Sequence, residues 1–309
     1  MRRLVPGCVV LLLAVGVVAV AALSRPEPAS PRPDTDAVVV ADRTRRATAR
    51  SADAASAPLT LTAGLGVALA GLVAGTVNTI VGSGSLVSFP ALLAVGFPPL
   101  VANVSNSVGL VPGSVSGAVA YRRELSGQRA RGLRLAVPAV AGGLGGAALL
   151  LTLPPGVFEM VVPALVGISS LLVLLQPRLR RFLQSGERAA DGGVALTAGV
   201  FLTSVYGGYF GAAQGVLLLS VLGLLLADHL QRLNAMKNVL AATVNGVAGG
   251  VYLLLAPVAW PAALVLAASS VVGGQVGGHL GRRIPETGLR IVVGVVGLAA
   301  AVWLQLFQS

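Results

Sequence analysis

The residues that could do chemistry in this chain are almost all neutral hydrogen-bonding groups in and around two glycine-rich stretches. They are Asn78, Gly82, Ser83, Gly84, Ser85, Asn103 and Asn106 in the first half of the chain, and Gly211, Gln214, Gly215, Asn234, Lys237 and Asn245 in the second. Both stretches interrupt long apolar runs, so each predicts a broken helix. Backbone N–H and C=O groups released at such a break must face protein or a water-filled cavity, where a ligand can bind them. The N–H groups of the helix that starts after each break favour an anion.

The charged residues favour an anionic or neutral polar ligand over a metal ion. Glu159, Asp228 and Glu286 are expected at loop positions, so we expect no carboxylate inside the membrane that could bind a cation. The single cysteine, Cys8, excludes an internal disulfide framework, a multi-cysteine zinc site and an iron–sulfur cluster. We therefore expect neither a metal nor another cofactor.

Several of these residues admit a second interpretation. Lys237 is the only lysine, and it lies four residues inside a predicted span. Its side chain could either extend back to the membrane interface or counter the charge of a bound anion. The amides and hydroxyls could instead bond to one another between helices. His279 could relay a proton or anchor a helix end at the interface.

An intramembrane enzyme is a competing class, with Ser83 or Ser85 as nucleophile and His279 as base. The order Val81-Gly82-Ser83-Gly84 lacks the Gly-x-Ser-Gly arrangement of a rhomboid-type site, and the second glycine-rich stretch would then have no role. No Gly-Lys-Ser/Thr follows the first stretch, so it is not a Walker phosphate-binding loop. We assign no catalytic residue.

The elements that must position these residues are membrane-spanning helices. Of the 309 residues, 55% are hydrophobic and 11% charged, against roughly 25% charged in a soluble domain, and the mean hydropathy is +0.86. Eight candidate spans lie at about 60–81, 100–120, 132–153, 156–175, 193–210, 233–256, 258–281 and 287–307. Two shorter apolar segments, about 86–97 and 216–227, follow the glycine-rich stretches and lack the roughly 20 residues that a span needs. The predicted fold is an all-α integral membrane protein with about eight transmembrane helices plus two short broken or re-entrant segments.

The chain is predicted to be an inverted duplication. From Gly71 and from Gly199 the same order recurs: a span, a glycine-rich break, a short apolar segment, an Asn-rich helix and two more helices. The repeats cover about 60–175 and 193–307. The fourteen basic residues of this domain fall in four clusters, at 122–134, 178–188, 232–237 and 282–290. Only if both short segments turn back do all four clusters share one face, which the positive-inside rule makes cytoplasmic. Leu59 and the C-terminus are then expected outside.

The net charge of +11 is thus an orientation signal, and we expect no nucleic-acid partner. Residues 1–23 are predicted to be a signal peptide or an uncleaved signal anchor. Residues 24–58, with five prolines, are predicted to be a disordered extracytoplasmic linker. The alternative for these segments is a gene start placed too far upstream. Residues 59–309 form the predicted polytopic transporter domain, in a bacterial inner membrane.

Several segments resemble the sulfite exporter TauE/SafE family, over about residues 60–307. In the first repeat these are Gly75-Thr76-Val77-Asn78-Thr79-Ile80-Val81-Gly82-Ser83-Gly84-Ser85-Leu86, Phe89-Pro90-Ala91-Leu92, Ala102-Asn103-Val104-Ser105-Asn106 and Ala120-Tyr121-Arg122-Arg123. In the second they are Gly208-Tyr209-Phe210-Gly211-Ala212-Ala213-Gln214-Gly215, Leu233-Asn234-Ala235-Met236-Lys237-Asn238, Asn245, Trp260 and Gly273 to Gly281. Where the family often has a run of glycines, this chain has Ala212-Ala213-Gln214. The resemblance implies a secondary carrier of sulfur-containing anions, usually with eight helices.

The expected function is that of a secondary membrane transporter (permease) for a small anion, exporting sulfite or a related organosulfur anion by alternating access. Its expected partners are this anion, the lipid bilayer, and a coupling proton or sodium ion; a homodimer stays an open alternative. Other open alternatives are ion-coupled anion uptake, a non-transport membrane scaffold and the intramembrane enzyme.

Overall fold

The computed structural model describes residue 55 and residues 58–183, 193–281 and 286–307, and this part of the chain contains ten helices and no strand. The predicted signal segment 1–23 lies outside the described residues, as does nearly all of the predicted linker 24–58. The first five helices are α3 (Leu61–Ile80), α4 (Ser85–Val95), α5 (Pro99–Ala120), α6 (Arg129–Thr152) and α7 (Pro155–Leu183). The other five are α8 (Gly193–Tyr209), α9 (Gln214–Leu225), α10 (Leu230–Leu255), α11 (Trp260–Leu280) and α12 (Glu286–Phe307).

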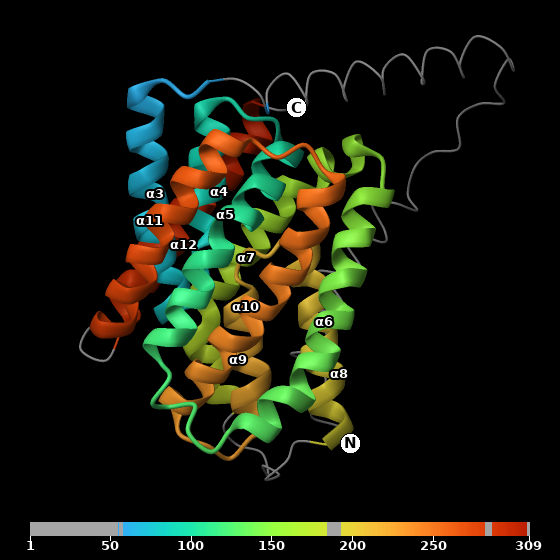
Figure 1. Ribbon diagram of the computed structural model, residues 1–309, viewed down its shortest axis with the longest axis vertical. Helices are drawn as coiled ribbons and strands as arrows, with labels where there is room; N and C mark the ends of the chain where they lie inside the picture. The colour runs from blue at the N-terminus through green and yellow to red at the C-terminus, as the bar shows by residue number, and fades with distance from the viewer. Residues whose placement is uncertain (1–54, 56–57, 184–192, 282–285, 308–309) are drawn as a thin grey trace, which may run out of the picture.

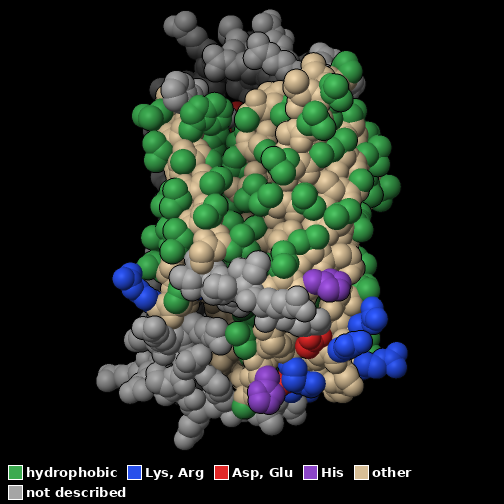
Figure 2. All heavy atoms as spheres, turned by 90° about the vertical axis from the view of Figure 1, so that its left-hand side faces the viewer, with side chains coloured by type: hydrophobic (Ala, Val, Ile, Leu, Met, Phe, Trp, Pro, Cys, Tyr) green, Lys and Arg blue, Asp and Glu red, His purple; other side chains and the backbone are tan. Residues whose placement is uncertain are grey.

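Six of these helices are long and apolar enough to cross a membrane, namely α3, α6, α7, α10, α11 and α12. The two other predicted spans are α5, whose 22 residues include Asn103, Asn106 and four serines, and α8, which has 17 residues. The predicted short segments are α4 and α9, with 11 and 12 residues. Hydrophobic side chains cover the length of the face that Figure 2 shows, as lipid requires. The chain is therefore an all-helical, multi-pass membrane protein.

Both short helices turn back against the helix that precedes them. A Cβ added to Gly84, just before α4, would lie 2.2 Å from the carbonyl oxygen of Ala74 in α3. At the far end of α4, Val95 lines a small cavity together with Thr60, just before the start of α3. Likewise, Gly207 packs against Gln214 at the α8–α9 turn, and Gly199 packs against Val221 farther along both helices. The hairpin prediction is confirmed for both segments.

The second five helices run in the opposite direction to the first five. The relative direction of two neighbouring helices follows from the order in which their residues contact each other. Helices α3 and α5 run parallel, α5 and α10 antiparallel, and α10, α6 and α8 parallel. Helices α3 and α5 meet at Asn78–Ser114 and Thr79–Gly117, and α5 and α10 meet at Asn245–Ser114 and Gly249–Val108. Helices α6 and α10 meet at Gly132–Met236 and Gly143–Val244, and α6 and α8 meet at Gly142–Phe201 and Gly146–Val205. Helix α8 therefore runs opposite to α3, which makes α3–α7 and α8–α12 inverted repeats.

Small residues let the helices of this bundle approach closely. A Cβ on Gly75 would lie 2.3 Å from the carbonyl oxygen of Ser270, and a Cβ on Gly146 would lie 2.0 Å from that of Val205. Gly75 packs α3 against α11, and Gly146 packs α6 against α8. The carbonyl oxygens leave no space for a larger residue at either glycine. Such close contacts are expected between membrane helices, which associate by close packing because no hydrophobic driving force acts between them.

Basic side chains gather at one end of the bundle, which we call the basic end (Figure 2). It holds the end of α5, the start of α6, the end of α7 and the start of α10, with Arg122, Arg123, Arg129, Arg131, Arg134, Arg178 and Arg232. Helix α3 starts and α12 ends at the opposite end (Figure 1). Arg188, Arg282 and Arg283 lie outside the described residues. The structure thus brings these seven arginines to the single end that the hairpin prediction requires.

Two of the three predicted loop carboxylates are in helices and not in loops. Asp228 lies between α9 and α10 as predicted, and Glu286 is the first residue of α12. Glu159 lies in the second turn of α7, because the helix begins at Pro155. Proline is favoured at the first position of a helix, where its missing N–H would have no partner in any case. The helix therefore begins one residue before the predicted span 156–175, and Glu159 lies inside that span and not in a loop.

Asp228 joins three segments at the basic end. Its carboxylate accepts a hydrogen bond from Arg131 Nη1 at 2.8 Å and from Arg232 Nε at 2.9 Å. Arg232 Nη1 also donates to the carbonyl oxygen of Ser126 at 3.0 Å, so the loop after α5 is included. Partial burial alone would raise the pKa of Asp228, but the hydrogen bonds from Arg131 and His229 N–H and the charge of Arg232 outweigh it and lower this pKa.

We expect Asp228→Asn to reduce the free energy of unfolding by about 1 kcal/mol at pH 7, because these ion pairs are partly exposed. A carboxylate whose pKa is lowered by folding stabilises the fold above its unfolded pKa of about 4, and the effect disappears as pH falls through the folded value. Denaturant unfolding in detergent should therefore show a constant difference between wild type and variant from pH 7 to pH 5, which closes below about pH 4. An equal difference at every pH would contradict this role.

Candidate functional site: the junction of two broken helices

At both glycine-rich breaks the preceding helix ends with the same backbone geometry. The N–H groups of Val81 and Gly82 both donate to the carbonyl oxygen of Val77, at 2.7 and 3.1 Å. At the end of α8 the N–H groups of Phe210 and Gly211 both donate to the carbonyl oxygen of Tyr206, at 3.0 and 3.3 Å. The φ angles of Gly82 and Gly211 are 92° and 78°, in the left-handed region that closes a helix. Each break is thus a helix terminus followed three residues later by a new helix.

The two breaks touch each other. The N–H of Gly215 donates to the carbonyl oxygen of Gly82 at 2.9 Å. A Cβ on either of these two glycines would lie 2.5 Å from the Cα of the other, so neither position has space for a side chain. The N-termini of α4 and α9, which belong to oppositely oriented repeats, are therefore brought to one place. We call residues 81–85 and 210–215 the junction.

Buried polar atoms without partners lie in the junction. Ser83 is 1% exposed and Gln214 3% exposed, and neither Ser83 Oγ nor Gln214 Nε2 has a hydrogen-bond partner within the described part of the chain. The N–H groups of Ser83, Gly84 and Ser85 likewise make no bond to any described backbone carbonyl. A buried donor left without a partner costs about 1–3 kcal/mol. These donors can therefore form hydrogen bonds with a ligand beside a helix N-terminus.

The last carbonyls of α3 are capped by α10. Lys237 Nζ donates to the carbonyl oxygens of Asn78 and Thr79 at 3.0 and 3.2 Å. The Nδ2 atoms of Asn234 and Asn238 donate to the same Thr79 oxygen at 3.4 and 3.3 Å. A cation at this position stabilises the negative end of the helix dipole. Lys237 is 0% exposed, so the interpretation that its side chain extends to the membrane interface is wrong.

The inverted repeat places an equivalent cap at the end of α8. Asn103 Nδ2 donates to the carbonyl oxygen of Tyr209 at 3.1 Å, and the Tyr252 hydroxyl donates to that of Gly208. Asn103 and Asn234 are both the fifth residue of their helices, α5 and α10. The position of Lys237, the eighth residue of α10, corresponds to Asn106 in α5. The two repeats therefore share the amide cap, but only the second adds a positive charge.

The structure gathers most of the predicted site residues but not all. Asn78 Nδ2 and Asn245 Nδ2 both donate to Ser114 Oγ, at 3.2 and 3.0 Å, which ties α3, α5 and α10 together beside the first break. Asn106 instead accepts a hydrogen bond from Ser88 Oγ at 2.5 Å, between α5 and α4. Ser85 is the first residue of α4 and is half-buried.

Sequence reasoning missed several residues that hold the junction in place. Ser114 receives the two amides described above. At the second break, the Tyr206 hydroxyl donates to the carbonyl oxygen of Ala212 at 2.7 Å and contacts Ser169 Oγ at 2.5 Å. The polar spacing of the Asn-rich helices could have indicated Ser114. Nothing comparable in the sequence indicates that the Tyr206 hydroxyl bonds to the turn that follows its own helix.

The geometry gives no support to serine catalysis. Ser83 Oγ has no partner, whereas His279 is exposed near the end of α11 with its Nδ1 2.9 Å from the carbonyl oxygen of Gln275. Within the described ranges no three His, Cys, Asp or Glu side chains gather as a metal site would need. What the junction offers is a set of neutral donors, suited to binding and releasing an anion.

Comparison with known proteins identifies the family of this chain. The profile of the family described as sulfite exporter TauE/SafE matches residues 67–304. The chain is 28% identical to the probable membrane transporter protein YfcA of Escherichia coli strain K12, over 75% of this chain and 84% of the relative. It is 27% identical to the probable membrane transporter protein ORF9 of Sinorhizobium sp, over 76% of this chain and 89% of the relative. No solved structure matches. The chain belongs to the sulfite exporter TauE/SafE family and is a multi-pass membrane transporter.

Proposed function

We propose that this protein is a secondary transporter that exports sulfite or a related organosulfur anion across the bacterial inner membrane, with the anion bound at the junction. The observation that carries the proposal is the contact between the two breaks, with the N-termini of two inverted helices beside the unpartnered Ser83 Oγ and Gln214 Nε2. Discontinuous helices at a repeat interface form the substrate sites of many secondary transporters. Helix N-termini bind anions through their N–H groups.

In this proposal the hydration shell of the anion is replaced by neutral donors. The N–H groups of Gly84 and Ser85, together with Ser83 Oγ and Gln214 Nε2, supply hydrogen bonds without a countercharge. Lys237 adds a positive charge from α10 while it remains bonded to the end of α3. A site without a fixed salt bridge to the ligand releases an anion readily, which a carrier requires.

Alternating access is proposed to occur about the contact of Gly82 with Gly215. This backbone contact joins the two breaks without interlocking side chains, so the breaks can shift relative to each other at this point. The basic end is proposed to be cytoplasmic by the positive-inside rule, which leaves the end of α12 outside. A reporter fused to the C-terminus that is active only in the cytoplasm should then be inactive.

The function is tested by flux into proteoliposomes that contain the purified full-length chain. Labelled sulfite, thiosulfate and an alkyl sulfonate are supplied separately, with and without a proton gradient, and unlabelled sulfate and chloride serve as competitors. We expect saturable sulfite flux that the gradient alters and that chloride does not inhibit. Flux only toward the cytoplasmic side would favour ion-coupled uptake. Absence of flux for all three anions would contradict the transporter proposal and leave the scaffold and enzyme alternatives.

A further inference from the structure

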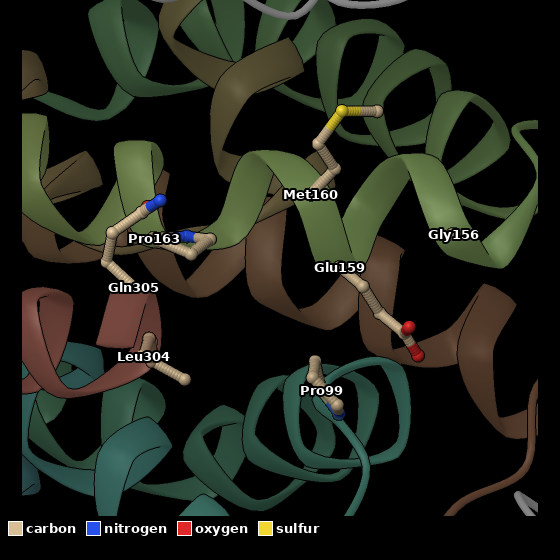
Figure 3. A pocket seen from close by; sticks show the side chains of 7 residues that line it. All are labelled: Pro99, Gly156, Glu159, Met160, Pro163, Leu304 and Gln305. Atoms are coloured by element: carbon tan, nitrogen blue, oxygen red, sulfur yellow. The ribbon is translucent and has the colours of Figure 1, made fainter. Parts of the chain in front are cut away.

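A second cavity, separate from the junction, lies at the end of the bundle opposite to the basic end. It has a volume of about 560 Å³ and is bordered by α5, α7 and α12 (Figure 3). Its lining residues are Pro99, Gly156, Glu159, Met160, Pro163, Leu304 and Gln305. They belong to the start of α5, the first turns of α7 and the last turn of α12, and none belongs to the junction.

The charge of this cavity favours a cation. Glu159 is its charged residue, and its side chain extends from α7 toward Pro99 of α5 (Figure 3). Within the described residues no hydrogen-bond donor or basic group pairs with this carboxylate. Pro99 has no N–H to offer to an anion, and the last turn of α12 presents the negative end of a helix dipole.

The size and the apolar half of the cavity favour an amphipathic ligand over a bare ion. A single ion needs about as much space as a water molecule, roughly 30 Å³, whereas 560 Å³ is the volume of a small-molecule site. Met160 is 57% exposed at its edge, and Leu306 next to Gln305 is 68% exposed. The cavity therefore opens onto the apolar side surface of α7 and α12, at the end of the helices where lipid headgroups lie.

We propose that this cavity binds the headgroup of an ethanolamine phospholipid. The primary ammonium donates hydrogen bonds to the Glu159 carboxylate, and an acyl chain lies along Met160 and the apolar surface of α12. A choline headgroup has no N–H with which to bond the carboxylate. An anionic headgroup is repelled by Glu159. The cavity thus distinguishes lipids by the chemistry of their amine.

The test measures the melting temperature of the full-length protein in detergent, by tryptophan fluorescence, as dioleoyl phosphatidylethanolamine, phosphatidylcholine or phosphatidylglycerol is added. We expect the ethanolamine lipid to raise the melting temperature by about 4 °C more than the other two, as saturating binding to the folded state would. Glu159→Gln should remove this difference, and Glu159→Asp should retain part of it. Glu124→Gln, a matched change at the basic end, should retain all of it.

Two outcomes would overturn the proposal. Equal shifts for the three lipids in the wild type would show that the cavity does not select an amine. An ethanolamine preference that survives in Glu159→Gln would show that the Glu159 carboxylate does not bind the ammonium. Soluble phosphoethanolamine is added at the same concentrations as a further arm. If it reproduces the full shift, the ligand is a free amine and the lipid assignment is wrong. None of these readouts depends on transport, so the result is independent of the function proposed for the junction.

Discussion

Gly82→Ala is expected to reduce transport by about a hundredfold or more, because the added methyl group has no space at the contact between the repeats. Its Cβ would lie 2.5 Å from Gly215 Cα and 2.6 Å from Gly215 C, and these are backbone atoms that cannot move aside like a side chain. The φ angle of 92° adds strain of about 1–3 kcal/mol for any residue other than glycine. Overpacking costs about 1–3 kcal/mol more, and 2.7 kcal/mol corresponds to a hundredfold change. The measurement is the initial rate of labelled sulfite flux in proteoliposomes, normalised to the inserted protein.

Gly96→Ala is the matched control for this variant. Gly96 ends α4 with a φ of 104°, so alanine there has a comparable backbone strain, but no atom lies within 4 Å of the added Cβ. We expect Gly96→Ala to lower the melting temperature slightly and to keep near-normal flux. If Gly82→Ala transported as well as Gly96→Ala, the junction would not be the moving contact between the repeats.

Lys237→Met is expected to reduce transport by about thirtyfold and to lower the stability of the protein. The variant leaves the carbonyl oxygens of Asn78 and Thr79 without their ammonium donor, and a hydrogen bond from a charged group contributes about 1.5–3 kcal/mol. Without the cap, the end of α3 is less well ordered, and the turn at Gly82 depends on that end. Flux and the melting temperature in detergent are measured on the same preparation.

Lys237→Gln separates the two roles that this lysine could have. A glutamine amide can donate to both carbonyl oxygens but carries no charge. If Lys237 mainly holds the end of α3, Lys237→Gln should recover at least about a third of the wild-type flux. If the charge itself attracts the anion, Lys237→Gln should be as defective as Lys237→Met and show a raised KM for sulfite. The second result would contradict the capping role.

The helices, the two breaks and their hairpin turns could be predicted from the sequence, because they depend on local composition and on the positions of a few charges. Apolar runs define the helices, and a glycine with positive φ ends each broken helix. The arginine clusters decide the direction of the chain, since only one folding of the short segments brings them to one end. Gly82 and Gly211 were therefore found by pattern alone.

The contacts between distant segments could not be predicted in the same way. Nothing local to Gly82 indicates that Gly215 is its partner, since that pairing results from the packing of two complete repeats. The direction of the Lys237 side chain also depends on a neighbour, the end of α3. Glu159 was misplaced for a different reason, because it was assigned to a loop although the predicted span 156–175 already contained it, and α7 begins at Pro155.

The most direct test of the central claim, that the junction binds the transported anion, is the equilibrium binding of labelled sulfite to Ser83→Ala, measured together with its melting temperature. Ser83 Oγ is buried without a partner, so its removal should leave the stability unchanged or raise it. Loss of one hydrogen bond to a bound anion should weaken sulfite binding about tenfold. Wild-type affinity in this variant, or weaker binding that merely accompanies a loss of stability, would contradict the proposed site.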